Sequence, residues 1–120
     1  MNPCSHLLLV VDDDPDYRDA ISEILQRDGY RVVRVENGRE ALEYLRGGGR
    51  PCVILLDMMM PVMNGWQFRQ EQQEDPSIQC IPVVMITASD ERRIGLIPNN
   101  QVLTKPIRVD ELLESVHRFC

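Results

Sequence analysis

Four short apolar runs in this chain each end at a polar residue of a type that phosphoryl-transfer chemistry uses. Asp12 and Asp13 follow the first run, Asp57 the second, Thr87 closes the third, and Lys105 lies just beyond the fourth. The runs are Leu7–Val11, Val53–Leu56, Val83–Ile86 and Val102–Leu103. In an open α/β sheet, ligands bind beyond the carboxyl ends of the strands, near the point where strand order reverses. If these runs are parallel strands, three carboxylates, one hydroxyl and one ammonium group meet at that edge.

Such a set of groups suits a metal ion and a phosphoryl group. Three clustered carboxylates repel one another unless a cation or a proton neutralises them, and oxygen-only ligands favour Mg²⁺ as the cofactor. Asp57 is our candidate phosphoacceptor, because a carboxylate can attack a phosphoryl group and form an aspartyl-phosphate. Thr87 would donate a hydrogen bond and Lys105 would supply a point charge, together neutralising the anion that grows in the transition state.

Each of these residues also has an ordinary explanation. An aspartate can cap a loop after a strand, and acids at a helix start are favoured by the positive end of the helix dipole. Asp14 and Asp16 fit that explanation well, whereas Asp12 and Asp13 fit it poorly. Alone, Thr87 would be a β-branched strand residue and Lys105 a surface lysine. Their combination with Asp57 is what favours a functional role.

The order of the motifs resembles a known family, the receiver domain of two-component response regulators, from about Leu7 to Phe119. The motifs are Val11-Asp12-Asp13, Asp57-Met58-Met59-Met60-Pro61 running to Asn64-Gly65, Thr87-Ala88 and Lys105-Pro106. The resemblance implies that Asp13 and Asp57 bind the metal directly, that Asp12 acts through water, and that the main-chain carbonyl of Met59 adds an oxygen. It also implies a cis bond before Pro106. The phosphoryl donor would be a histidine kinase or a histidine phosphotransfer protein, and the phosphorylated form would act on a downstream protein.

Strand and helix patterns alternate along the chain, which predicts an α/β fold with a doubly wound parallel sheet. We expect five strands in the order 2-1-3-4-5, as in flavodoxin-like folds, with helices on both faces and a single domain over residues 1–120. Besides the first and second runs, Leu7–Val11 and Val53–Leu56, strands are predicted at Tyr30–Val35, Ile81–Ile86 and Val102–Thr104. Helices are predicted from Pro15 to Gly29, from Asn37 to Gly47, at Trp66–Glu74 and at Val109–Phe119. Asp14 would cap the first helix, with Pro15 at its first position.

Composition narrows the class of protein. A net charge of −6 argues against a nucleic-acid-binding surface, which needs a basic patch. No apolar stretch is long enough to cross a membrane, and the first residues lack the pattern of a signal peptide. The four cysteines, Cys4, Cys52, Cys80 and Cys120, have no motif-like spacing, which argues against zinc. We interpret Cys52 and Cys80 as small buried thiols at strand starts, and a cytoplasmic location as the default.

Two departures from the family pattern lie close together. Val102 stands where family members usually carry a tyrosine or phenylalanine whose ring moves on phosphorylation. The segment from Thr87 to Lys105 is about one helical turn shorter than usual, roughly 4 residues, and Pro98 disfavours a long helix there. We therefore expect an altered output face, a monomer or weak dimer, and signalling through backbone movement between residues 87 and 100.

Two other functions compete with a phosphoacceptor domain. The first is a binding module of the same fold that works without phosphorylation. The second is a Mg²⁺-dependent phosphatase with an aspartate nucleophile, but such enzymes place a second aspartate two residues later, where this chain has Met59. The expected protein is therefore not an enzyme with a separate substrate. It would be a phosphoacceptor that assists its own phosphorylation and dephosphorylation, either as a stand-alone receiver or as one cut from a larger protein.

Overall fold

A single parallel sheet of five strands runs through the centre of the computed structural model, which describes residues 6–58, 60, 62–87 and 102–120. The strands are β1 (Leu7–Val11), β2 (Arg31–Val35), β3 (Val53–Asp57), β4 (Val83–Thr87) and β5 (Val102–Thr104). They lie in the order β2-β1-β3-β4-β5, and every neighbouring pair is parallel. The order predicted from the sequence is confirmed, and with it the α/β fold.

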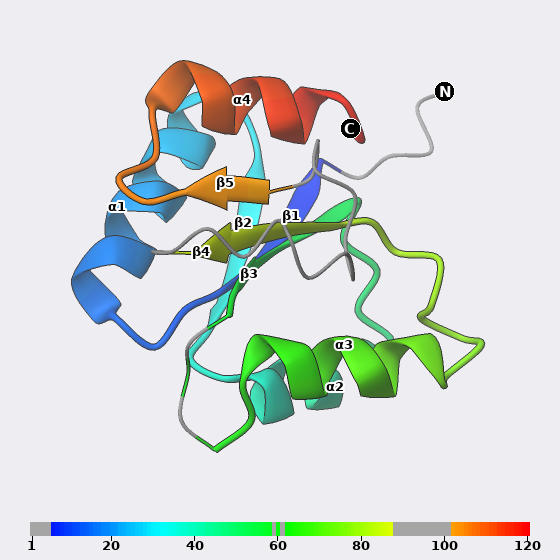
Figure 1. Cartoon of the computed structure of the whole chain (residues 1–120). Helices are drawn as coiled ribbons and strands as arrows, with labels where there is room; N and C mark the ends of the chain where they lie inside the picture. The colour runs from blue at the N-terminus through cyan, green and yellow to red at the C-terminus, as the bar shows by residue number, and fades with distance from the viewer. Residues whose placement is uncertain (1–5, 59, 61, 88–101) are drawn as a thin grey trace, which may run out of the picture.

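Helices cover both faces of the sheet (Figure 1). The described helices are α1 (Pro15–Arg27), α2 (Gly38–Arg46), α3 (Gly65–Gln73) and α4 (Val109–His117). In Figure 1, α1 and α4 lie on one side of the sheet and α2 and α3 on the other. The segment in which a further, short helix was expected, between Thr87 and Val102, lies outside the described residues.

Each face of the sheet has its own hydrophobic core. On one face, β-strand side chains such as Leu9 and Ile54 pack with Leu42 of α2 and Phe68 of α3. On the other face, a second cluster joins residues of α1, α4 and the sheet, among them Leu8, Ile21, Leu25, Leu55, Leu112 and Val116. All five residues of β3 are buried, as an unbroken apolar run predicts for a strand covered on both sides. This rigid centre fixes where the strand ends lie.

Local sequence explains how the helices start beside those strand ends. Asp14 caps α1, its side chain accepting from the backbone N–H groups of Asp16 and Tyr17, and Pro15 occupies the first turn as predicted. Asn64 caps α3 in a capping box with Gln67. Gly65 follows, and a Cβ atom there would lie 2.8 Å from Met58 Cα, so only glycine allows this close approach. The loop after Asp57 is thereby packed against the start of α3.

The observed bounds of β1 and β5 are the predicted ones, and those of the other elements differ by one or two residues. The fourth strand begins at Val83, whereas the sequence pattern had indicated Ile81. Pro82 has no N–H group to donate to a sheet, although its carbonyl accepts a bond of 2.9 Å from Ile54 N. Within the described ranges, no helix is both long and apolar enough to cross a membrane.

The interpretation of the cysteines as buried thiols is wrong. Cys52, immediately before β3, forms a disulfide with Cys120, beyond the end of α4, and their Cα atoms are 5.8 Å apart. Cys80 is a free and exposed thiol. The bonded pair is separated by 68 residues in the sequence, so only the folded sheet and the packing of α4 bring the two cysteines together. Cys4 lies outside the described residues.

Candidate functional site

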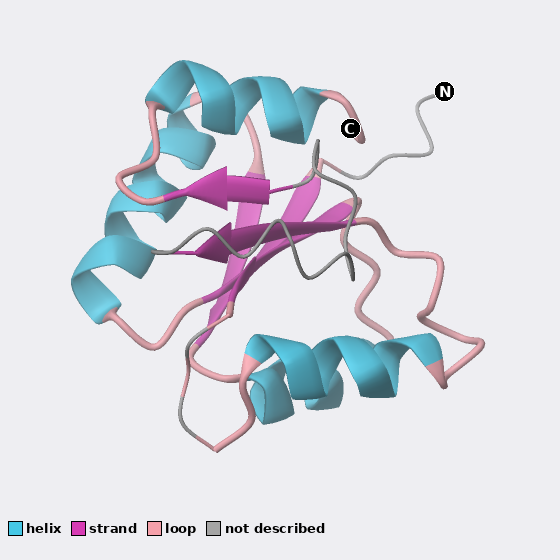
Figure 2. Ribbon diagram, in the orientation of Figure 1, coloured by secondary structure: helices cyan, strands magenta, loops and turns pink. Residues whose placement is uncertain are grey.

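Four of the strands deliver a predicted site residue to the same edge of the sheet. Asp12 follows β1, Asp57 is the last residue of β3, Thr87 is the last residue of β4, and Lys105 follows β5. The arrowheads in Figure 2 mark the carboxyl ends of these strands. Because β1 and β3 are neighbours while the connection between them crosses from one face to the other, this edge is a topological switch point. Met59, whose carbonyl was also predicted to bind metal, lies outside the described residues.

Three aspartates form a compact acidic cluster at this edge. Asp12, Asp13 and Asp57 each offer one carboxylate oxygen, and these atoms lie within 4.8 Å of one another. Asp12 and Asp57 are only 1% and 4% exposed, whereas Asp13 faces solvent. Like charges this close together in a poorly solvated place repel strongly unless a cation binds between them. The donor set therefore fits a hard divalent cation with oxygen ligands.

Asp12 is held rigidly except at one oxygen. Its Oδ1 atom accepts a bond of 2.9 Å from Asp14 N, and its main-chain carbonyl accepts one of 2.8 Å from Arg18 Nη1. Its Oδ2 atom is buried and has no hydrogen-bond donor within the described part of the chain. Buried carboxylate oxygens rarely stay without a partner. An ion or its bound water would satisfy this atom, which is a second observation in favour of a cation at the cluster.

Lys105 brings a positive charge to the two buried carboxylates. Its Nζ atom lies 3.7 Å from Asp12 Oδ2 and 3.8 Å from Asp57 Oδ2. The backbone sets this position, because Lys105 N donates a bond of 2.8 Å to Thr87 O, directly extending the pairing of β5 with β4. The peptide bond between Lys105 and Pro106 is cis, as the family resemblance implied.

Thr87 is completely buried at the end of β4. In the register of the sheet, Ile86 lies opposite Asp57, so Thr87 is one position beyond the carboxylate-bearing residue on the neighbouring strand. The same register places Thr104, the residue before Lys105, opposite Thr87. The hydroxyl-bearing residue thus stands between the strand that carries Asp57 and the strand that leads to Lys105.

Sequence reasoning missed two residues that contact this site. In the sequence, Tyr17 recurs at helical spacing with the apolar residues Ile21 and Ile24, and in the structure its ring lies 4.5 Å from Lys105 Nζ. Arg18 was not singled out, yet it binds the Asp12 carbonyl. The spacing of Tyr17 explains its packing against the sheet and gives no sign of its second contact. The short distance in sequence from Asp13 to both residues was the only available signal.

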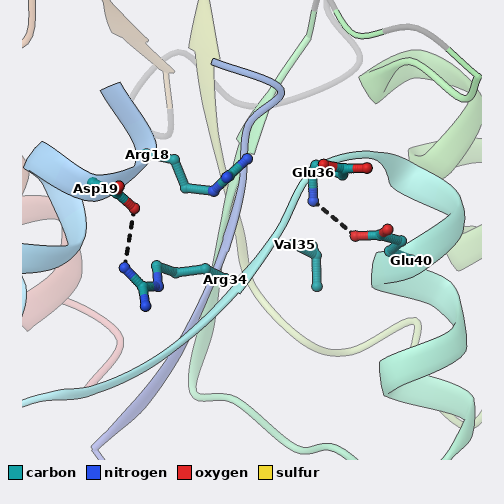
Figure 3. Close-up of a pocket in the computed structure, with 6 residues that line it drawn as sticks. All are labelled: Arg18, Asp19, Arg34, Val35, Glu36 and Glu40. Carbon is teal, nitrogen blue, oxygen red and sulfur yellow. Dashed lines mark hydrogen bonds and ion pairs between the residues drawn. The ribbon is translucent and has the colours of Figure 1, made fainter. Parts of the chain in front are cut away.

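A polar pocket lies beside the acidic cluster, where α1, β2 and the start of α2 meet (Figure 3). Arg18 and Arg34 line it together with Asp19, Glu36 and Glu40. Arg34 is paired with Asp19 at 3.0 Å, and Glu40 accepts from the backbone N–H of Glu36. Arg18 binds the Asp12 carbonyl at 2.8 Å, so both arginines of this pocket are already engaged by protein oxygens.

Comparison with known proteins agrees with this geometry. A family model described as the response regulator receiver domain matches residues 8–117. The chain belongs to this family. It is 30% identical over 114 residues to protein PilH of Pseudomonas aeruginosa. The matched region covers 92% of this chain and 93% of PilH. Receiver domains serve two-component signalling, so the family and class predicted from the motifs are confirmed.

Solved receiver domains share the fold over nearly the whole chain. The signal receiver domain of a signal transduction histidine kinase from Syntrophus aciditrophicus superposes with a TM-score of 0.84 at 31% identity, covering 94% of this chain and 88% of that one. The receiver domain of the sensor histidine kinase PA1611 from Pseudomonas aeruginosa gives a TM-score of 0.83 at 27% identity, covering 94% and 95%. The PA1611 structure has a magnesium ion coordinated in its active site cleft.

Proposed function

We propose that this receiver domain takes a phosphoryl group onto Asp57 from a phosphohistidine of a kinase or phosphotransfer protein, in the presence of Mg²⁺. The observation that carries the proposal is the arrangement at the sheet edge. A buried carboxylate at the end of the central strand lies 3.8 Å from the ammonium group of Lys105 and within one acidic cluster with Asp12 and Asp13. That arrangement supplies a nucleophile, a fixed positive charge and a cation-binding donor set in one place.

In the transfer step, an Asp57 carboxylate oxygen attacks the phosphorus atom. A new O–P bond forms as the P–N bond to the histidine breaks, and the imidazole leaves with the electron pair of that bond. The product is an acyl phosphate. Because the transition state of phosphoryl transfer is loose, the protein contributes mainly position and charge. Lys105 is placed to neutralise phosphoryl oxygens from the β5 side, and Thr87 to donate a hydrogen bond from the end of β4.

The residues at the cluster fit Mg²⁺ as the cofactor. Asp13 and Asp57 would hold the ion, with Asp12 acting through water and the Met59 carbonyl as a further ligand, as the family resemblance implies. When bound, Mg²⁺ supplies charge stabilisation to the phosphoryl oxygens. The proposal is supported by the buried Asp12 Oδ2 atom without a hydrogen-bond donor in the described residues, and by the magnesium-bound PA1611 receiver.

In this proposal the phosphorylated domain acts by protein contact. Its surface would bind a downstream protein differently in the two states, because a phosphoryl group shifts a two-state equilibrium only through its differential interactions with those states. The acidic net charge of −6 favours protein partners over nucleic acid. We expect the protein to be a monomer or a weak dimer. We expect it to act in the cytoplasm.

A labelling experiment tests the proposal. Purified protein is incubated with radiolabelled acetyl phosphate in Mg²⁺ or in EDTA. We expect Mg²⁺-dependent label on the wild type that is lost in base, as an acyl phosphate is. Asp57→Asn should take up none, whereas Asp19→Asn, a change at an exposed aspartate of α1, should label normally.

The labelling experiment and a phosphatase assay together separate the competing functions. A phosphorylation-independent binding module would take up no label in any variant. A phosphatase would release phosphate from a stable monoester such as p-nitrophenyl phosphate in many turnovers. Either result would contradict the proposed phosphoacceptor function.

A further inference from the structure

Lys105 is the only lysine in the chain, and its ammonium group lies among three side chains. Two are the carboxylates of Asp12 and Asp57, and the third is the ring of Tyr17 from α1. The lysine side chain is 24% exposed, so most of its surface is covered by protein. The residue expected to stabilise the phosphoryl group therefore has contacts from β1, β3 and α1.

Neither carboxylate holds the ammonium group by a hydrogen bond. The distances of 3.7 and 3.8 Å exceed the range of about 2.7–3.2 Å for N–H···O bonds. The Tyr17 ring centroid is 4.5 Å from Nζ, well within the roughly 6 Å over which a cation is attracted to an aromatic face. The ammonium group therefore has two ion pairs without a hydrogen bond and one cation–π contact.

Tyr17 also contacts the backbone that follows Lys105. Its hydroxyl oxygen accepts a bond of 3.2 Å from Ile107 N, in the loop between β5 and α4. Tyr17 itself sits in the first turn of α1, where its backbone N–H points to the capping Asp14 side chain at 3.4 Å. One side chain thus bridges the helix that starts behind the acidic cluster and the loop that carries Lys105, through two separate contacts.

We propose that Tyr17 is a positioning residue for Lys105. Its ring fixes the ammonium group on the α1 side of the cluster and its hydroxyl fixes the backbone beyond Pro106. The effect of Tyr17 on phosphorylation rests on the proposed phosphoacceptor function. The positioning of Lys105 is a property of the unphosphorylated protein. A lysine side chain has four rotatable bonds, and a ring that restricts them raises the fraction of molecules with the charge in place for transfer.

The same contacts couple Lys105 to α1. Val102 of β5 stands where family members usually carry an aromatic ring. It is half-buried and packs with the core on the α2 and α3 side. The aromatic contact of Lys105 comes from α1. A movement of Lys105 toward a phosphoryl group on Asp57 therefore changes its contact with Tyr17, and with it the link between α1 and the loop before α4.

Nuclear magnetic resonance of the single lysine tests the positioning directly. Protein grown with lysine labelled with ¹³C at the ε carbon gives one ε-methylene signal, which belongs to Lys105. In the wild type we expect its protons upfield of free lysine, because they lie against the face of a ring. Tyr17→Phe should keep that shift, and Tyr17→Leu should move the signal to the free-lysine position. Tyr44→Leu, at a tyrosine of α2, is the matched control and should leave the shift unchanged.

The hydroxyl contact has its own readout. Amide exchange at Ile107 should be faster in both Tyr17→Phe and Tyr17→Leu, because each lacks the oxygen that accepts from Ile107 N. The two variants thus separate the ring from the hydroxyl. An unchanged lysine signal in a folded Tyr17→Leu variant, or a wild-type signal at the free-lysine position, would overturn the proposal.

The functional consequence is measured with acetyl phosphate at saturating Mg²⁺. Tyr17→Leu should be phosphorylated about 3- to 10-fold more slowly, the range expected for losing one cation–π contact, and Tyr17→Phe at nearly the wild-type rate. Affinity for Mg²⁺ should stay unchanged in both, since neither variant removes a proposed ligand. A purely structural defect would weaken Mg²⁺ binding as well, and an unchanged rate in Tyr17→Leu would contradict the proposed role.

The two proposals fail in different ways. If the wild type takes up no phosphoryl group, the proposed function is wrong, while the lysine signal still shows whether Tyr17 positions Lys105. If the wild type is phosphorylated and Tyr17→Leu behaves identically in both measurements, the phosphoacceptor function stands and the role of Tyr17 is refuted.

Discussion

Lys105 Nζ lies 3.8 Å from Asp57 Oδ2, close enough for electrostatic attraction and too far for a hydrogen bond. The ammonium group is therefore near the proposed phosphoacceptor without blocking its oxygen. A lysine in this position can approach a phosphoryl group once the group is attached to Asp57. The positive charge and the nucleophile therefore belong to two separate side chains, which can be changed one at a time.

Replacing Lys105 with glutamine should slow phosphorylation without weakening the metal site. The variant removes a charge that would stabilise the transition state, so we expect a loss of about 10- to 100-fold in the rate with acetyl phosphate. Mg²⁺ should bind at least as tightly, because the ammonium group no longer repels a cation at the same carboxylates. Stopped-flow phosphorylation and isothermal titration measure the two quantities. Weaker Mg²⁺ binding in Lys105→Gln would contradict the proposal that Lys105 acts on the phosphoryl group and the carboxylates alone hold the metal.

Mg²⁺ should stabilise the folded protein by binding to the acidic cluster. Without Mg²⁺, repulsion among the three carboxylates should lower the stability. In EDTA, Asp13→Asn should unfold at a higher temperature than the wild type, because one of three clustered charges is gone. Added Mg²⁺ should raise the unfolding temperature of the wild type by binding the native state, and should leave Asp13→Asn nearly unchanged. Differential scanning calorimetry gives both values.

Asp14→Asn is the matched control for this prediction. Asparagine caps a helix about as well as aspartate, so α1 should remain intact and the Mg²⁺ response should match the wild type. An equal response to Mg²⁺ in Asp13→Asn and the wild type would remove Asp13 from the proposed site.

The Cys52–Cys120 disulfide should contribute substantially to stability. It closes a long loop across 68 residues, and bonds of this kind typically stabilise by about 2–4 kcal/mol through the unfolded state. Urea unfolding of the wild type with and without dithiothreitol should therefore differ by that amount, and Cys120→Ser should match the reduced wild type. Cys80→Ser, at the exposed free thiol, should change nothing. Identical unfolding curves with and without reductant would contradict this assignment.

Val62 should be a site of backbone strain in the loop between β3 and α3. Its φ angle is +68°, which a β-branched residue rarely adopts, and its side chain is 69% exposed. Glycine or asparagine accepts this conformation, so Val62→Gly or Val62→Asn should raise the free energy of unfolding by about 0.5–1 kcal/mol. Val109→Asn, at an exposed valine in the first turn of α4, should give no gain. Destabilisation by both substitutions at Val62 would show that its side chain contributes more than the strain costs.

The strands and the placement of the site residues at the strand ends could be predicted because they depend on local signals, whereas the strand order was taken from flavodoxin-like folds. Unbroken apolar runs such as Val53–Leu56 indicate strands buried on both faces, and a polar residue directly after such a run must emerge at the carboxyl edge. The disulfide could not be predicted, because no local pattern relates Cys52 to Cys120. The contact of Tyr17 with Lys105 was hidden for a similar reason: helical spacing already accounts for an apolar ring at Tyr17. The left-handed backbone at Val62 carries no glycine or asparagine signal.

The most direct test of the central claim is to locate the phosphoryl group by chemical trapping. Wild-type protein is phosphorylated with acetyl phosphate and Mg²⁺, reduced with borohydride, digested and analysed by mass spectrometry. Borohydride converts an aspartyl-phosphate to homoserine, which marks the acceptor residue permanently. The account predicts homoserine at residue 57 alone, and none when Mg²⁺ is omitted. Homoserine at Asp12 or Asp13, or its absence from every aspartate despite Mg²⁺ and phosphodonor, would contradict it.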